Sequence, residues 1–190
     1  VILEPADRAG PDAFTPAASM GPEVGGPTTS ASSATVPTPD RWTAQPVSGD
    51  TPGLYGGTPH GAGCDRRKIG SYLAAHPAKA RAWAAVLGIR TGSIEQYLDQ
   101  LTPVVLMADT RVRNHGFRDG RATEREAVLQ AGTAVLVDSS GLPRVRCSCG
   151  NPLLPPGSAT SADEPVSAQG TPWPAFRAGS IQVPVPATTP

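Results

Sequence analysis

The sequence has no excess charge, few aromatic residues and no long apolar run. Its 16 basic and 16 acidic residues give a formal net charge of zero, so charge provides no case for binding nucleic acid or an anionic membrane surface. Aromatic residues make up 5% of the chain, which predicts a modest hydrophobic core. No stretch approaches the roughly 20 apolar residues that span a bilayer, so we expect no membrane contact by this segment itself.

The signature motifs of common enzyme classes are also missing. The sequence contains no GxSxG, HExxH, P-loop or CxxC pattern. His115 with Asp119 could supply acid–base chemistry, and Ser139 with Ser140 a nucleophile. Such chemistry needs a partner at a defined position, and the sequence shows none. We therefore predict that the chain is not an enzyme and has no catalytic residue.

Proline and glycine, in contrast, are abundant, with 22 and 21 copies, and they predict extended segments around a compact centre. The composition divides the chain into five parts. They are a strand-like N-terminal segment (1–16), a Pro/Gly/Ser/Thr linker (17–48), a core domain (49–154), a second linker (155–171) and a C-terminal part (172–190) with an aromatic anchor and an edge strand.

Apolar periodicity predicts three short helices in succession within residues 64–101. Asp65 is a suitable N-cap for the first helix, and Pro77 ends it and opens the second. Gly88 suits the C-terminal end of the second helix, and Ser93 predicts a capping box for the third.

After residue 103 the pattern changes to that of strands. Residues 104–113 are rich in strand formers, Arg-Asp-Gly at 118–120 predicts a turn, and 133–149 predict a hairpin. Residues 122–132 are rich in Ala and Glu and predict one or two helical turns. The predicted class is α+β, with a small three-helix layer packed on a short antiparallel sheet or hairpin and extended Pro/Gly-rich termini.

The three cysteines are the clearest chemical feature. Cys147 and Cys149 alternate with polar residues and share the predicted buried face of Val145. We predict a disulfide from Cys64 to either of them, which closes a loop of about 80 residues and stabilises the fold by roughly 4 kcal/mol in the chain-entropy model. Disulfides persist in oxidising compartments, so the predicted location is extracellular or at the cell surface.

A zinc site is the less favoured alternative for these thiols. Its ligands would be Cys64, Cys147, Cys149 and His115. The C-x-C spacing departs from the C-x₂-C of common zinc knuckles. Zinc aside, the sequence suggests no cofactor.

Arginines are concentrated in the predicted strand region, where acidic residues nearly balance them. A solvated strand face is the favoured interpretation, and an anionic surface glycan is the partner that such a cluster would suit. The cluster comprises Arg111, Arg113, Arg118, Arg121, Arg125, Arg144 and Arg146.

Several strings stand out as a set: EPADRAGPDAFT (4–15), GDTPGLYGGT (49–58), PAKARAWAAVLGI (77–89), DTRVRNHGFRDGRAT (109–123) and VLQAGTAVLVDSSGLPRVRCSCGNPL (128–153). Together with the cysteines, this set resembles an uncharacterised actinobacterial family of extracellular domains. The resemblance implies that members commonly follow a signal or single transmembrane helix and face the outside of the cell. It also implies that all three cysteines are family features, and it implies no activity or ligand.

Two functions are consistent with these features. The favoured one is a non-catalytic extracellular structural or interaction module, including a subunit of a surface filament, in which Val1, Ile2, Leu3 and Phe14 contact other copies of the chain. The second is a ligand-sensing or cell-wall-binding ectodomain of a membrane-anchored protein. A concave pocket lined by the arginine cluster would favour the second.

Overall fold

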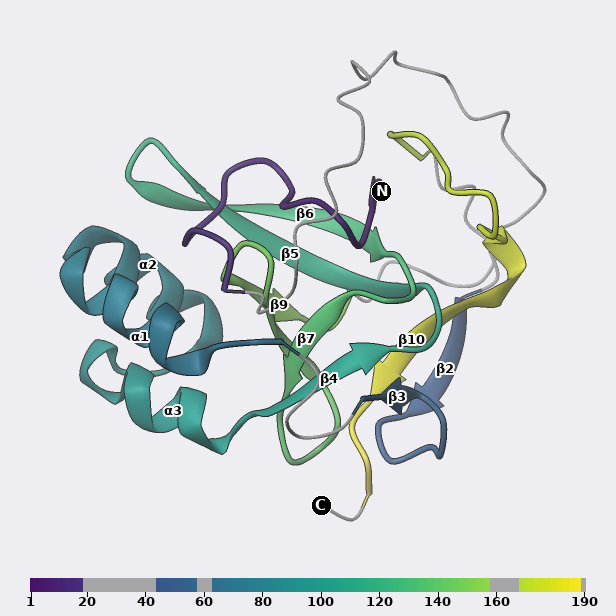
Figure 1. Cartoon of the computed structure of the whole chain (residues 1–190), viewed down its shortest axis with the longest axis horizontal. Helices are drawn as coiled ribbons and strands as arrows, with labels where there is room; N and C mark the ends of the chain where they lie inside the picture. Colours follow the sequence, from purple (N-terminus) through teal and green to yellow (C-terminus); the bar gives the residue numbers. More distant parts are fainter. Residues whose placement is uncertain (19–43, 58–62, 158–167, 189–190) are drawn as a thin grey trace.

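The computed structural model describes residues 1–18, 44–57, 63–157 and 168–188, and its main feature is a curled mixed sheet of ten strands (Figure 1). Eight strands follow one another in the order β1-β6-β5-β9-β8-β7-β4-β3, while β10 pairs with β2 and β5. The strands are β1 (Ile2–Glu4), β2 (Ala44–Ser48), β3 (Tyr55–Gly56), β4 (Thr102–Leu106), β5 (Thr110–Arg118), β6 (Arg121–Leu129), β7 (Ala134–Val137), β8 (Pro143–Arg146), β9 (Asn151–Leu154) and β10 (Ile181–Val185).

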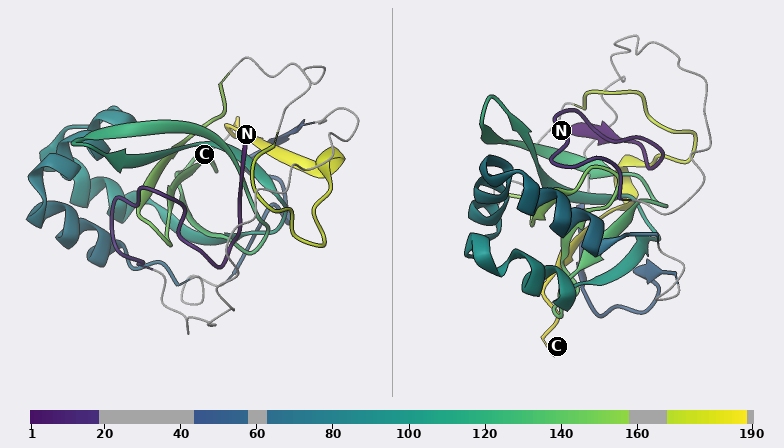
Figure 2. Two further views of the ribbon diagram at one scale, coloured as in Figure 1. Left: turned by 90° about the horizontal axis from the view of Figure 1, so that it is seen from above. Right: turned by 60° about the vertical axis from the view of Figure 1, so that its left-hand side comes forward.

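Three short helices lie together at one end of the sheet (Figures 1 and 2). They are α1 (Arg66–Ala75), α2 (Pro77–Leu87) and α3 (Ile94–Gln100), and 3-10 turns precede α3 (η1, Thr91–Ser93) and β10 (η2, Ala178–Ser180). The three helices that periodicity predicts are therefore present.

Local capping explains where these helices begin and end. The Asp65 carboxylate accepts a hydrogen bond from the Lys68 backbone N–H at 3.0 Å and caps α1. Gly88 closes α2 in the left-handed conformation with φ of 68°, which glycine adopts without a steric penalty. The predicted capping box of the third helix is wrong, because Ser93 makes no side-chain cap hydrogen bond.

The predicted fold class is wrong in its balance, because the sheet dominates the molecule and the helices cover one end of it. The predicted helical turns at 122–132 are largely strand β6, which pairs with β5 along its whole length and with β1 on its other side. Ala and Glu favour helices by only a fraction of a kcal/mol each, roughly, so hydrogen bonding and packing on both edges outweigh that preference.

The β5–β6 hairpin confirms the turn predicted at 118–120. Asp119 and Gly120 have φ of 50° and 79°, the left-handed pair that a two-residue type I′ turn requires. Nine residues of β5 then pair in register with β6, from Thr110 opposite Leu129 to Arg118 opposite Arg121. The predicted second hairpin is also present as β7 and β8. Its second strand is shorter than predicted, because β8 ends at Arg146 and both cysteines lie in the turn that follows.

The buried side chains form three clusters. The largest joins the helices to the sheet around Trp83 and includes Phe14 from the N-terminus. The second fills the curled sheet around Leu106 and Leu129. The third is small and gathers the chain ends, with Leu3 packed near Trp173.

Residues 1–18, which we call the N-terminal segment, pack against their own chain. Strand β1 lies parallel to β6, with Leu3 opposite Val128. Farther along, the Phe117 N–H donates to the Asp12 carbonyl at 2.7 Å. A Cβ on Gly116 would lie 2.7 Å from the Asp12 Cβ, so the neighbouring glycine permits this close crossing.

The same packing includes the four residues that were predicted to contact other copies of the chain. Leu3 and Phe14 are buried in the protein's own core. Ile2 pairs with Ala127 of the same chain, and Val1 packs against the third cluster. In this structure, therefore, all four side chains contact their own domain.

The C-terminal strand and the first linker also differ from their predicted form. The sequence predicts an edge position for the last strand. Instead, β10 pairs with β2 along its whole length and with β5 through Gln182 and Thr110, so it has a neighbour on each side. Residues 44–48 of the predicted linker 17–48 form β2, and 19–43 lie outside the described residues. Of the second predicted linker, 158–167 lie outside them as well.

Candidate functional site

A cleft of about 680 Å³ lies between helix α2 and the β5–β6 hairpin. We call it the α2–hairpin cleft. Its volume falls in the range of roughly 300–1,000 Å³ that is typical of small-molecule sites, and the cleft is shallow and open to solvent rather than enclosed. It is lined by Ala78, Arg81, Ala82, Ala85 and Val86 of α2 and by His115, Gly120, Arg121, Ala122, Glu124 and Leu154 of the sheet.

Helix α2 creates the room for this cleft with a stripe of alanines. Ala78, Ala82 and Ala85 line the cleft at spacings of four and three residues, which places them on one face of the helix. Trp83 and Leu87 lie on a different face and are buried in the core. Because alanine side chains end at Cβ, the helix can pack near the hairpin without filling the space between them.

His115 forms part of the cleft wall and is held from both sides. Its Nε2 lies 3.2 Å from a Glu124 carboxylate oxygen, and its Nδ1 lies 3.3 Å from the Pro152 carbonyl oxygen. The residue is 4% exposed. A general base needs a ring nitrogen that faces its substrate, whereas both nitrogens here face oxygens of the protein. The predicted pairing with Asp119 is replaced by the pairing with Glu124.

Two arginines in the cleft lining differ from most others in the strand region. Arg81 of α2 and Arg121 of β6 are exposed. Across the described ranges, neither guanidinium has a hydrogen-bond or ion-pair partner. The cleft therefore combines an apolar alanine floor with two cationic groups that are not neutralised by the protein.

The remaining six arginines of the predicted cluster each have a carboxylate partner. The ion pairs are Arg111–Glu126, Arg113–Glu124, Arg118–Asp12, Arg125–Glu4, Arg144–Asp138 and Arg146–Glu4. The favoured interpretation as a solvated strand face is wrong for Arg111 and Arg146, which are 5% and 0% exposed. Both faces of β8 are covered, so alternation along that strand does not separate buried from solvated side chains.

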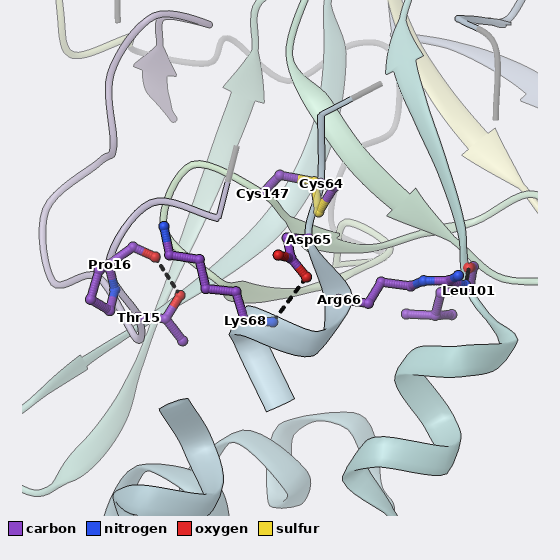
Figure 3. Close-up of a disulfide and its surroundings, with 8 residues drawn as sticks. All are labelled: Thr15, Pro16, Cys64, Asp65, Arg66, Lys68, Leu101 and Cys147. Atoms are coloured by element: carbon purple, nitrogen blue, oxygen red, sulfur yellow. Dashed lines mark hydrogen bonds between the residues drawn. A yellow bond between two sulfur atoms is a disulfide. The ribbon is translucent and has the colours of Figure 1, made fainter. Parts of the chain in front are cut away.

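The cysteines form a disulfide between Cys64 and Cys147, with a Cα–Cα distance of 5.3 Å (Figure 3). It joins the residue before the α1 cap to the residue after β8. Cys149 is a free thiol and is buried. Burial raises the pKa of this thiol above its ordinary value, which disfavours the reactive thiolate.

The alternative zinc ligands are not gathered in one place. Two of the four, Cys64 and Cys147, are bonded to each other, and His115 is paired with Glu124. Within the described ranges, no three His, Cys, Asp or Glu side chains form a group that could hold a metal ion. These residues therefore do not supply the tetrahedral set that zinc prefers.

Most of the cleft cannot be predicted from the sequence. Arg81, Glu124 and the alanine stripe belong to no motif that marks a site. The alanine spacing at 78, 82 and 85 was the available signal, because small residues on one face of a helix leave space beside it. The position of that face opposite the hairpin depends on long-range pairing and could not be read locally.

Comparison with known proteins identifies a family without identifying an activity. The sequence model of a domain of unknown function, DUF6777, matches residues 45–190, so the chain belongs to this family. No curated protein and no solved structure shows a significant match. Within the described part of the chain, no helix is both long and apolar enough to cross a membrane.

Proposed function

We propose that this member of the DUF6777 family is a non-catalytic binding module on the outer side of the cell, and that its α2–hairpin cleft binds an acidic surface glycan. The observation that carries the proposal is the pair of unpartnered guanidinium groups, Arg81 and Arg121, at a cleft of about 680 Å³. Of the two functions predicted from the sequence, this proposal corresponds to the second, a ligand-sensing or cell-wall-binding ectodomain.

The chemistry of the lining supports an anionic ligand with a compact apolar face. A guanidinium can donate two parallel hydrogen bonds to one carboxylate or phosphate group. The alanines at 78, 82 and 85 offer a shallow apolar floor, on which the C–H face of a sugar ring can lie. Glu124 is the acidic side chain of the lining, and it is already engaged by His115 and Arg113.

Other features support the remaining parts of the proposal. The disulfide between Cys64 and Cys147 is compatible with an oxidising compartment outside the cell. The two hydrogen-bond acceptors at His115 leave no ring nitrogen for acid–base work, which supports a non-catalytic role. An actinobacterial origin and attachment behind a membrane anchor belong to the same proposal and rest on the sequence resemblance.

Isothermal titration calorimetry with defined oligosaccharides tests this function. The probes are galacturonic acid oligomers, neutral galactose oligomers of the same length, and phosphorylated galactose oligomers, which carry phosphate in place of carboxylate. We expect the acidic probes to bind and the neutral probe not to bind. The two acidic probes distinguish which anionic group the cleft prefers.

The matched variants are Arg81→Ala with Arg121→Ala in the cleft and Arg90→Ala as the control. Arg90 is an exposed arginine just beyond α2, and it does not line the cleft. The double variant should bind at least about tenfold more weakly, since a hydrogen bond to a charged group contributes about 1.5–3 kcal/mol. Equal binding of acidic and neutral probes, no binding of either acidic probe, or an unchanged affinity of the double variant would show the proposal to be wrong.

A further inference from the structure

Within the described residues, the N-terminal segment is held on its own chain by residues that are far away in sequence. Its side-chain and backbone partners include Lys79, Asn114, Arg125, Arg146 and Gln169. We propose that the surface beneath this segment is a receptor that the N-terminal segment of a second copy can fill, so that two copies exchange their N-terminal strands. The proposal is independent of the ligand of the α2–hairpin cleft.

Strand addition is the first element of this receptor. Strand β1 continues the sheet beside β6 in parallel register, with Ile2 opposite Ala127 and Glu4 opposite Leu129. The Leu3 N–H also donates to the Gln169 carbonyl at 2.8 Å. Without β1, one edge of β6 would be open, and an open strand edge is a surface on which an extended peptide can pair.

A buried charged cage is the second element. The Glu4 carboxylate accepts hydrogen bonds from Arg146, from Arg125 at 2.8 Å and from Asn114 at 2.7 Å. Arg146 also donates to the carbonyls of Pro5 and Arg8, and Arg146 is fully buried. A buried guanidinium without its carboxylate is strongly destabilising, so the body of the protein requires a strand that delivers an acidic side chain at this position.

An aromatic anchor is the third element. Phe14 is fully buried and packs against Phe117, with ring centroids 5.4 Å apart. Its backbone N–H donates to the Asn151 side chain at 2.9 Å, and its carbonyl accepts from the Lys79 ammonium at 2.7 Å. The receptor thus recognises a strand, a glutamate and a phenylalanine ten residues later, a combination that residues 1–18 of any copy provide.

The covalent connection is long enough for exchange. Residues 19–43 join the N-terminal segment to β2, and a chain of that length can extend to at most about 80–90 Å. A compact domain of this size has a radius of gyration of about 16 Å, so a neighbouring copy is within reach. The family match begins at residue 45, so the receptor lies in the matched domain and the segment outside it.

The N-terminal segment makes the same contacts whether it binds its own chain or a second copy. The protein concentration therefore determines which of the two states is populated. A tethered segment has an effective concentration on the order of millimolar. We expect a monomer at micromolar concentration and exchanged dimers, or longer open chains, near millimolar concentration. The same contacts would link copies that are held close together on a surface.

Cysteine trapping across the β1–β6 pair tests the exchange. Two single variants, Ile2→Cys and Ala127→Cys, are made with Cys149→Ala, so that only the native disulfide and one new thiol are present in each chain. A double variant with both cysteines in one chain is the geometric control, and it should form an internal link and run as a monomer. The two single variants are mixed near millimolar concentration after brief incubation in denaturant and refolding, then analysed by non-reducing mass spectrometry.

We expect a covalent dimer joined between position 2 of one chain and position 127 of the other. Adding Glu4→Gln to the Ile2→Cys chain should lower the dimer yield at least about tenfold, because the donated strand then lacks the carboxylate that the receptor binds. No dimer in the mixture, a dimer yield that is unchanged by Glu4→Gln, or a double variant that fails to link internally would each overturn the proposal.

Discussion

Arg146 is fully buried, and its charge is balanced by Glu4, a residue 142 positions earlier in the sequence. The pair is part of the cage that also includes Asn114 and Arg125. Bringing two charges out of water is expensive, and the cost is recovered only when their hydrogen bonds are nearly complete. Two polar atoms of the cage, Arg146 Nε and Asn114 Oδ1, are buried without a hydrogen-bond partner among the described residues. We therefore expect the cage to specify one register of the N-terminal strand more than to add net stability.

Glu4→Gln should lower the free energy of unfolding by about 3–5 kcal/mol, the range for breaking a buried ion pair by removing one partner. The amide cannot balance the two guanidinium groups that face it. Urea unfolding followed by Trp fluorescence measures the change. Glu95→Gln, on the exposed surface of α3, is the control and should change stability by less than about 0.5 kcal/mol.

A second variant separates the loss of charge balance from a general packing defect. Replacing Glu4 and Arg146 together by methionine removes most of the buried charge, and the double variant should recover part of the stability lost by Glu4→Gln alone. If Glu4→Gln costs less than 1 kcal/mol, the cage is not the constraint that the structure indicates.

Cys149 gives a second test at the scale of one residue. The thiol is buried, and this burial raises its pKa, so a thiol reagent such as DTNB should label the native protein very slowly at pH 8. In denaturant without reductant, one thiol per chain should react, because Cys64 and Cys147 are joined. When the unfolded protein is first reduced and the reductant is then removed, all three thiols should react with DTNB. Rapid labelling of the native protein would contradict the burial.

At the scale of elements, the helices were predictable and most strand partners were not. Asp65, Pro77 and Gly88 act within a few residues of their own position, so sequence alone locates α1 and α2. Strand β6 contains Ala and Glu, and its identity depends on pairing with β1 and β5. Parallel pairs such as β10 with β2 join segments more than a hundred residues apart, and no local pattern encodes them.

Trp83 connects the helical end to the sheet. Its side chain is fully buried in the largest cluster, and its indole N–H donates to the Gly150 carbonyl at 2.9 Å. Trp83→Ala should therefore destabilise the protein by about 3–5 kcal/mol, the range for truncating a large buried aromatic. Chemical denaturation followed by circular dichroism measures the effect.

Trp83→Phe is the informative partner variant. It keeps most of the ring volume and removes the hydrogen bond to Gly150, so its cost should be clearly smaller than that of alanine. A cost below 1 kcal/mol for Trp83→Ala would mean that α2 does not depend on this contact for its position on the sheet.

At the scale of the molecule, the candidate site and the disulfide are formed by different elements. The α2–hairpin cleft depends on how α2 lies against β5 and β6, which composition could not reveal. The disulfide was predictable up to the choice between two cysteines, because three thiols in a chain with few aromatics favour a cross-link. The choice itself depends on the turn after β8, which brings Cys147 to Cys64 and leaves Cys149 buried elsewhere.

The disulfide should contribute much of the stability of the whole chain. Cys64 and Cys147 are separated by 83 positions, and closing a loop of that length stabilises by roughly 4 kcal/mol in the chain-entropy model. A domain typically has only about 5–15 kcal/mol in total. Replacing both cysteines by alanine, with Cys149→Ala as the matched control, should therefore lower the free energy of unfolding by about 2–5 kcal/mol. Reductant should lower the free energy of unfolding of the wild-type protein to that of the variant that lacks Cys64 and Cys147. It should not change the stability of that variant. If reductant has no effect on a wild-type protein shown by mass spectrometry to be reduced, the cross-link is not a stabilising element, and the argument for an oxidising compartment loses its physical basis.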